Sequence, residues 1–64
     1  MTDDTTRPTI LIVDDEVDLL RGLQRSITLE MDCRVLLAEN GTRALERLRN
    51  DSVDLVLEIG RAHV

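Results

Sequence analysis

The chain has 64 residues, enough for one small domain at most. It has no aromatic residue, and its single cysteine, Cys33, excludes an internal disulfide. The net charge is −5, and eight arginines are scattered among thirteen acidic residues, which argues against direct contact with nucleic acid. The polar start is not a signal peptide, and no apolar run approaches the roughly 20 residues that span a bilayer. We therefore expect a cytoplasmic protein with no membrane contact, in which Cys33 is a small buried residue.

Residues 1–8 are polar and end in a proline, so we expect a flexible leader. The run TILIV at 9–13 follows it without polar alternation. Such a run is typical of a strand that is covered on both faces, as in a parallel sheet.

The period then changes to that of a helix, which we expect from residue 17 to about 30–32. Its apolar residues recur at spacings of three and four: Val17, Leu20, Leu23 and Ile27. Asp15 or Glu16 is expected to cap the start of this helix. Gly22 lies inside it at a cost of up to about 1 kcal/mol relative to alanine, which predicts a packing reason for the glycine.

The second half repeats the alternation. RVLLA at 34–38 predicts a second buried strand, and Asn40 is expected to cap a short helix whose apolar face is formed by Ala44, Leu45 and Leu48. VDLVL at 53–57 predicts a third strand. The order predicts an α/β fold, a three-stranded parallel βαβαβ fragment of a doubly wound (flavodoxin-like) sheet with right-handed crossovers.

Asp14 and Asp15 follow the first strand directly, and Glu16 comes next. Ligands of open parallel sheets bind beyond the carboxyl ends of the strands. Adjacent carboxylates repel each other unless a cation lies between them, and oxygen ligands suit Mg²⁺, the usual metal of phosphoryl chemistry. The plainer interpretation is a pair of solvated loop acids beside a helix cap.

Three stretches, ILIVDDEVDLLRGL, AENGTRALERL and DLVL, together resemble the receiver domain of bacterial response regulators in two-component signalling, across residues 9–57. The resemblance implies a signalling module, not an enzyme. It implies that a histidine kinase or a phosphotransfer protein supplies a phosphoryl group to an aspartate after the third strand. It also implies that Asp14 and Asp15 help to hold Mg²⁺.

The family pattern breaks after DLVL. The phosphoacceptor aspartate is expected at position 59, where this chain has Ile59, and Glu58 lies one residue early, on the opposite face of the strand. No residue is therefore expected to accept a phosphoryl group, and Mg²⁺ binding is expected to be weak or absent. The family's later elements, including a lysine on the fifth strand, are also not found, so we interpret residues 9–57 as a truncated receiver domain.

The tail EIGRAHV at 58–64 resembles the translation of a common short-read sequencing adapter, which continues into a stop codon. We hypothesise that this tail is not native and that the natural residue 59 is aspartate. His63, Gly60 and Arg61 are accordingly given no functional role.

Two other functions are weighed. A degenerate receiver would act as a protein-binding module without phosphorylation. A phosphatase-like hydrolase would use an aspartate nucleophile after its first strand, but its Asp-x-Asp pattern is here Asp14 and Glu16. Half a doubly wound sheet also leaves the third strand with an open, apolar edge, which predicts poor solubility.

Overall fold

A computed structural model of the chain describes residues 7–59. It contains five elements: β1 (Thr9–Val13), α1 (Val17–Glu30), β2 (Arg34–Ala38), α2 (Gly41–Asn50) and β3 (Leu55–Glu58). The expected order of strands and helices is confirmed. Most of the expected leader and residues 60–64 of the expected tail lie outside the described residues.

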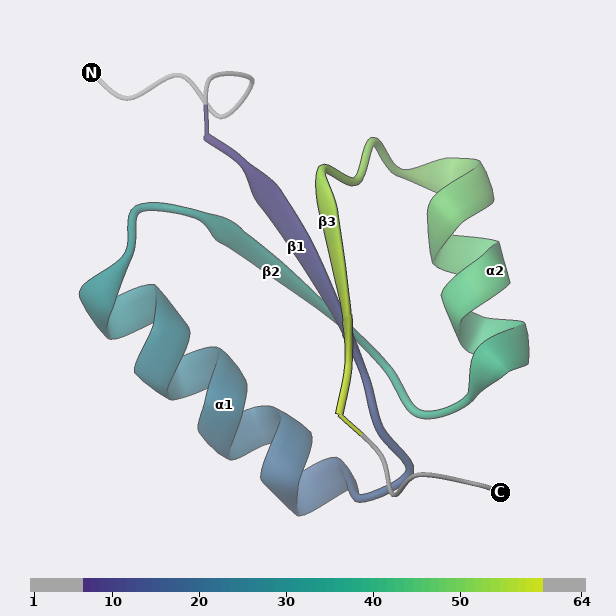
Figure 1. The fold of residues 1–64 in the computed structure, drawn as a ribbon, viewed down its shortest axis with the longest axis horizontal. Helices are drawn as coiled ribbons and strands as arrows, with labels where there is room; N and C mark the ends of the chain where they lie inside the picture. Colours follow the sequence, from purple (N-terminus) through teal and green to yellow (C-terminus); the bar gives the residue numbers. More distant parts are fainter. Residues whose placement is uncertain (1–6, 60–64) are drawn as a thin grey trace.

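The three strands form one parallel sheet in the order β2-β1-β3 (Figure 1). α1 covers one face of the sheet and α2 covers the other. Opposite faces are what two crossovers of the same hand require, because the connection from β1 to β2 and the connection from β2 to β3 run in opposite directions across the sheet. The predicted fold class is therefore confirmed.

The core has two parts, one on each side of β1, and every residue of β1 is buried. Towards α1 lie Ile10, Ile12, Leu20, Cys33 and Val35. Towards α2 lie Leu11, Val13, Ala38 and Ala44. Each large side chain that is fully buried stabilises the fold by about 1.5–3 kcal/mol, so β1 is the main source of cohesion. Cys33 is a free, buried thiol, as expected.

The two helices begin differently. Asn40 caps α2 as predicted, because its side chain accepts a hydrogen bond from the backbone N–H of Arg43 at 2.8 Å. Glu16 occupies the cap position of α1 but makes no side-chain cap hydrogen bond. The backbone N–H of Glu16 instead donates to Asp14, so the turn before α1 is stabilised from the strand side.

The third strand is shorter at its start than predicted, since β3 begins at Leu55 and not at residue 53. The side chain of Asp54 accepts the hydrogen bond of the Thr9 N–H in place of a backbone carbonyl, and the regular ladder begins with the pair of Ile10 and Leu55. Val53 packs against the cluster on the α2 side instead.

Leu45 and Leu48, on the expected apolar face of α2, are 57% and 44% exposed, because α2 rests on β1 and β2 through the small side chain of Ala44. One expectation about the helices was wrong. Gly22 has no packing reason, because a Cβ built there meets nothing within 4 Å. Among residues 7–59, neither helix has the length and apolar character that a membrane span requires.

Candidate functional site

Three consecutive acidic residues lie where β1 ends. One carboxylate oxygen from each of Asp14, Asp15 and Glu16 falls in a group whose atoms lie within 4.8 Å of one another. Asp14 is only 5% exposed, whereas Asp15 and Glu16 face solvent. The structure thus brings together the two predicted site residues, and Glu16 with them, at the carboxyl end of a parallel sheet, where ligands of such sheets bind.

Asp14 is held in place by hydrogen bonds on both sides. Its backbone N–H donates to the carbonyl oxygen of Ala38 at 3.1 Å, which extends the pairing of β1 with β2 by one residue. Its Oδ1 accepts the N–H of Glu16 at 2.8 Å. This hydrogen bond restrains the orientation of the buried carboxylate before any ligand binds.

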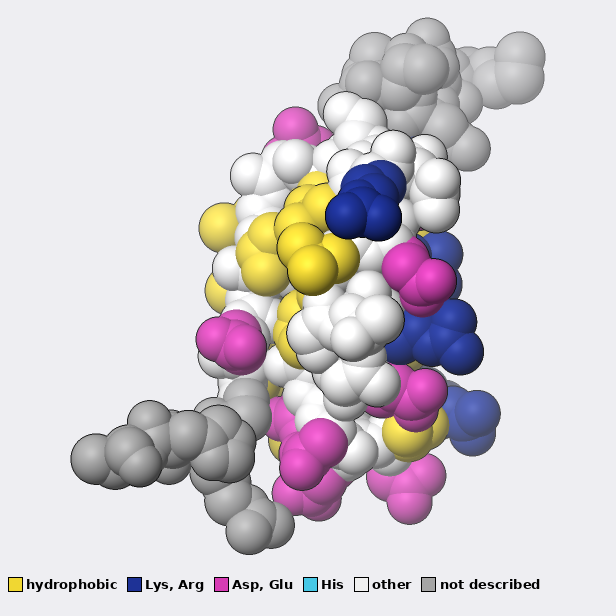
Figure 2. Space-filling view, turned by 90° about the vertical axis from the view of Figure 1, so that its right-hand side faces the viewer, with side chains coloured by type: hydrophobic (Ala, Val, Ile, Leu, Met, Phe, Trp, Pro, Cys, Tyr) yellow, Lys and Arg dark blue, Asp and Glu magenta, His cyan; other side chains and the backbone are white. Residues whose placement is uncertain are grey.

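The spacing of the cluster suits a small hard cation. Mg²⁺ takes six oxygens at about 2.1 Å, so ligands in its shell are at most about 4.2 Å apart. The three oxygens lie within 4.8 Å of one another, so at most a small movement of the exposed Asp15 and Glu16 side chains brings them into that range. Figure 2 shows that several acidic side chains gather towards the lower end of the molecule, where the strands finish in Figure 1. These charges repel one another, and a bound cation would relieve that repulsion.

Position 59 lies beside this cluster. The ladder between β1 and β3 pairs Val13 with Glu58, and the N–H of Ile59 donates to the carbonyl oxygen of Val13 at 3.0 Å. The next pair in register is Asp14 and Ile59, so these two side chains share a face of the sheet. Glu58 shares the face of Val13, which packs towards α2. Glu58 precedes position 59 by one residue, and strand side chains alternate between faces, so Glu58 lies on the opposite face of the sheet from Asp14.

A family model for the response regulator receiver domain matches residues 10–58, from β1 to the last residue of β3. The chain belongs to this family. Receiver domains are signalling modules of two-component systems, and the family generally binds Mg²⁺. No curated protein and no solved structure matches the chain. The expected resemblance to a receiver domain is thus confirmed.

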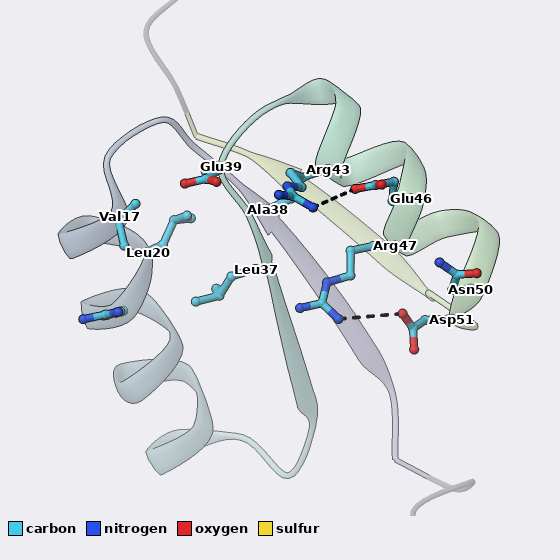
Figure 3. A pocket seen from close by; sticks show the side chains of 11 residues that line it. Val17, Leu20, Leu37, Ala38, Glu39, Arg43, Glu46, Arg47, Asn50 and Asp51 are labelled. Atoms are coloured by element: carbon cyan, nitrogen blue, oxygen red, sulfur yellow. Dashed lines mark hydrogen bonds and ion pairs between the residues drawn. The ribbon is translucent and has the colours of Figure 1, made fainter.

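A groove of this receiver domain, apart from the acidic cluster, lies between α1 and α2, over the outer edge of β2, with a volume of about 570 Å³ (Figure 3). Leu20, Leu37 and Ala38 contribute its apolar lining. Arg43 is paired with Glu46 at 3.2 Å and Arg47 with Asp51 at 3.9 Å, each within or at the end of α2. Because these arginines already have carboxylate partners, they are not poised to bind an anion. Asp14 and Asp15 do not line this groove.

Two polar side chains that the sequence did not single out hold the strands in place. Asp54 accepts the N–H of Thr9 at 2.8 Å. Gln24 of α1 donates from Nε2 to the carbonyl oxygen of Val35 in β2 at 3.2 Å. The sequence carries a signal only for Asp54, a carboxylate directly before an apolar strand. A glutamine on a helix face carries no comparable signal, because its partner is a backbone atom of another element.

Proposed function

We propose that this receiver domain carries a weak Mg²⁺ site, in which Asp14 and Asp15 are the ligands from the protein and the ligand at position 59 is missing. A buried carboxylate with one oxygen already oriented, next to an exposed carboxylate, supports this assignment. When bound, Mg²⁺ supplies positive charge that neutralises the oxygens of a phosphoryl group in transfer. Asp14 provides a fixed ligand, and Asp15 provides a mobile one that can adjust to the shell.

We further propose that position 59 is the phosphoacceptor position of the family and that the chain is not phosphorylated as written. The observation that carries this proposal is the register of β3, because residue 59 is the next partner of Asp14. In a receiver, a carboxylate here attacks the phosphorus of the donor. Isoleucine has no lone pair to do so. Glu58 does not replace it, because its side chain points to the α2 face.

Intact mass spectrometry tests this proposal. The chain is incubated with Mg²⁺ and a small phosphodonor, and the expected result is no mass increase of one phosphoryl group. A stable adduct on the chain would overturn the proposal. Mild base treatment, which cleaves acyl phosphates but spares phosphoserine and phosphothreonine, would show whether such an adduct sits on a carboxylate.

For a form of this domain with aspartate at position 59, the proposed phosphoryl source is a histidine kinase or a phosphotransfer protein in the cytoplasm. The proposed domain comprises residues 9–57, and we propose that residues 58–64 are a non-native tail. Sequencing of the gene across codons 58–64 tests this. Native codons that encode Glu58 and Ile59 would refute it.

A degenerate receiver that binds a protein partner without phosphorylation is the second candidate. It is favoured by the apolar character of the nucleophile position, since Ile59 is 39% exposed next to a carboxylate cluster. If Ile59 and the residues after it are native, substitution of Ile59 by serine should weaken partner binding. If residues 58–64 are instead a non-native tail, substitution of Ile59 by serine should leave partner binding unchanged.

A further inference from the structure

The first residue of β1 and the residue before β3 are joined by two hydrogen bonds. The N–H of Thr9 donates to Oδ2 of Asp54 at 2.8 Å, and the N–H of Asp54 donates to the carbonyl oxygen of Thr9 at 2.9 Å. Thr9 is 4% exposed, so its N–H has little access to water. This reciprocal pair lies at the opposite end of β1 from the acidic cluster.

The carboxylate of Asp54 substitutes for a backbone carbonyl. In a parallel sheet, alternate residues of the central strand bond to each neighbour. The N–H of Asp14 bonds to β2, and the carbonyl of Val13 accepts from β3, so the odd-numbered residues of β1 face β3. The N–H of Thr9 thus points to β3, where continued pairing would supply the carbonyl of residue 53. Asp54 fills that position with its side chain and ends the ladder.

We propose that Asp54 is a positioning residue, whose carboxylate fixes the register of β3 on β1 and so sets residue 59 beside Asp14. β3 is a short edge strand, and Leu55, Val56 and Leu57 are all aliphatic, so these three side chains alone do not distinguish the observed register from one shifted by two. The charge-assisted hydrogen bond to Thr9 singles out one register, because only one alignment brings Asp54 to the buried N–H.

A change in the register of β3 would move residue 59 away from Asp14. A shift by two residues keeps every side chain on its face but moves the end of β3 by about 6.6 Å. Residue 59 would then be out of reach of a cation bound at Asp14, since ligand oxygens of one Mg²⁺ ion lie within about 4.2 Å of one another. The inference rests on the proposed function for the importance of position 59. The register itself is measurable without metal or phosphodonor, so failure of one idea is distinguishable from failure of the other.

Disulfide trapping in the full 64-residue chain reads the register. Cys33→Ala removes the native thiol, and Val13→Cys is combined either with Glu58→Cys or with Val56→Cys. The first pair is opposed in the observed register, and the second is opposed after a shift by two. Neighbouring strands lie about 4.8 Å apart, within the Cα range of a disulfide. The ratio of the two cross-linking rates reports the register even if the chain is only partly ordered. In the chain that keeps Asp54, the pair at positions 13 and 58 should cross-link faster than the pair at positions 13 and 56.

Asp54→Ala should lower this ratio by roughly tenfold, the factor expected for a hydrogen bond to a charged group. Asp54→Asn keeps an acceptor oxygen and should restore most of the ratio. Asp51→Ala removes a carboxylate from the same loop and serves as the matched control, with no expected change. An unchanged ratio in Asp54→Ala, an equal fall in Asp51→Ala, or no rescue by asparagine would each overturn the proposal, because general destabilisation slows both cross-links together.

Discussion

The N–H of Ile59 donates to the carbonyl oxygen of Val13 at 3.0 Å, so the pairing of β3 with β1 continues past Glu58, the last residue of the strand. This hydrogen bond aligns residue 59 with Asp14, the buried member of the acidic cluster. The backbone of the receiver fold is therefore intact at this position. If position 59 is the phosphoacceptor position, as proposed, only its side chain differs from what phosphoryl transfer requires.

Ile59→Asp should add a third carboxylate ligand to the proposed pair Asp14 and Asp15 and so strengthen Mg²⁺ binding. We expect an increase in affinity of roughly tenfold, since each added charged ligand raises the affinity of an oxygen site for a hard cation. Isothermal titration calorimetry with Mg²⁺ measures it directly.

The matched control for this prediction is Glu58→Gln combined with Ile59→Asp, which has the same net charge as the natural chain. It should bind Mg²⁺ as well as Ile59→Asp does, because Glu58 lies on the α2 face. If the double variant falls back to the affinity of the natural chain, the gain comes from overall charge, and the assignment of position 59 to the site is wrong.

The fold was predictable because its signals are local. The unbroken apolar run of β1, the helical spacing of Leu20 and Leu23, and the cap at Asn40 each depend on residues close together in the sequence. The acidic pair was predictable as a cluster for the same reason, since Asp14 and Asp15 are adjacent.

What sequence reasoning missed depends on distant partners. The start of β3 was misplaced because the side chain of Asp54 competes with the backbone for Thr9, which lies 45 residues away. Leu45 belongs to the expected apolar face of α2 but is exposed, because the helix contacts the sheet through the smaller Ala44. The helical period gives the apolar stripe, and the position of the helix over the sheet decides which part of that stripe is covered.

Two substitutions of Asp14 should have opposite effects on stability in the absence of metal. Asp14→Ala removes the acceptor of the Glu16 N–H and should destabilise the chain by about 1–2 kcal/mol. Asp14→Asn keeps an acceptor and removes one of three clustered charges. The three carboxylates lie within 4.8 Å of one another, where two charges repel by about 1 kcal/mol in water, and asparagine removes two of the three repulsions, so it should stabilise the chain by up to about 2 kcal/mol.

Amide hydrogen exchange of Leu11 and Ile12, measured at low ionic strength, reports both effects because these residues lie in the centre of the sheet. Added Mg²⁺ should slow exchange in the natural chain but not in Asp14→Asn. Slower exchange in Asp14→Ala than in the natural chain would show that the hydrogen bond at the turn contributes nothing.

Gly22→Ala should stabilise α1 by about 1 kcal/mol, because alanine loses less backbone entropy in a helix and the new methyl group meets no atom within 4 Å. Circular dichroism and exchange of the α1 amides provide the measurement. Gly41→Ala is the control, since a Cβ there is equally unobstructed but the residue lies at the first position of α2, where propensity matters less. Loss of helicity in Gly22→Ala would point to a partner that packs against this helix face.

Val56→Lys should reduce self-association of the 64-residue chain, which we expect to be poorly soluble. β3 pairs only with β1 among the described residues, so its other edge is open, and Leu55 and Val56 are 50% and 45% exposed. An open apolar edge strand favours pairing with another chain, and a lysine on it opposes that pairing. Sedimentation velocity at increasing concentration should show a larger monomer fraction for the variant.

Leu29→Lys is the matched control for the edge strand, because it adds the same charge and removes an aliphatic side chain that is 78% exposed on α1. It lies away from β3 and should leave association nearly unchanged. If both lysine variants raise the monomer fraction equally, association follows net charge. If only Val56→Lys does, the contact runs through the edge of β3, which is also the edge that Asp54 and Thr9 hold in register.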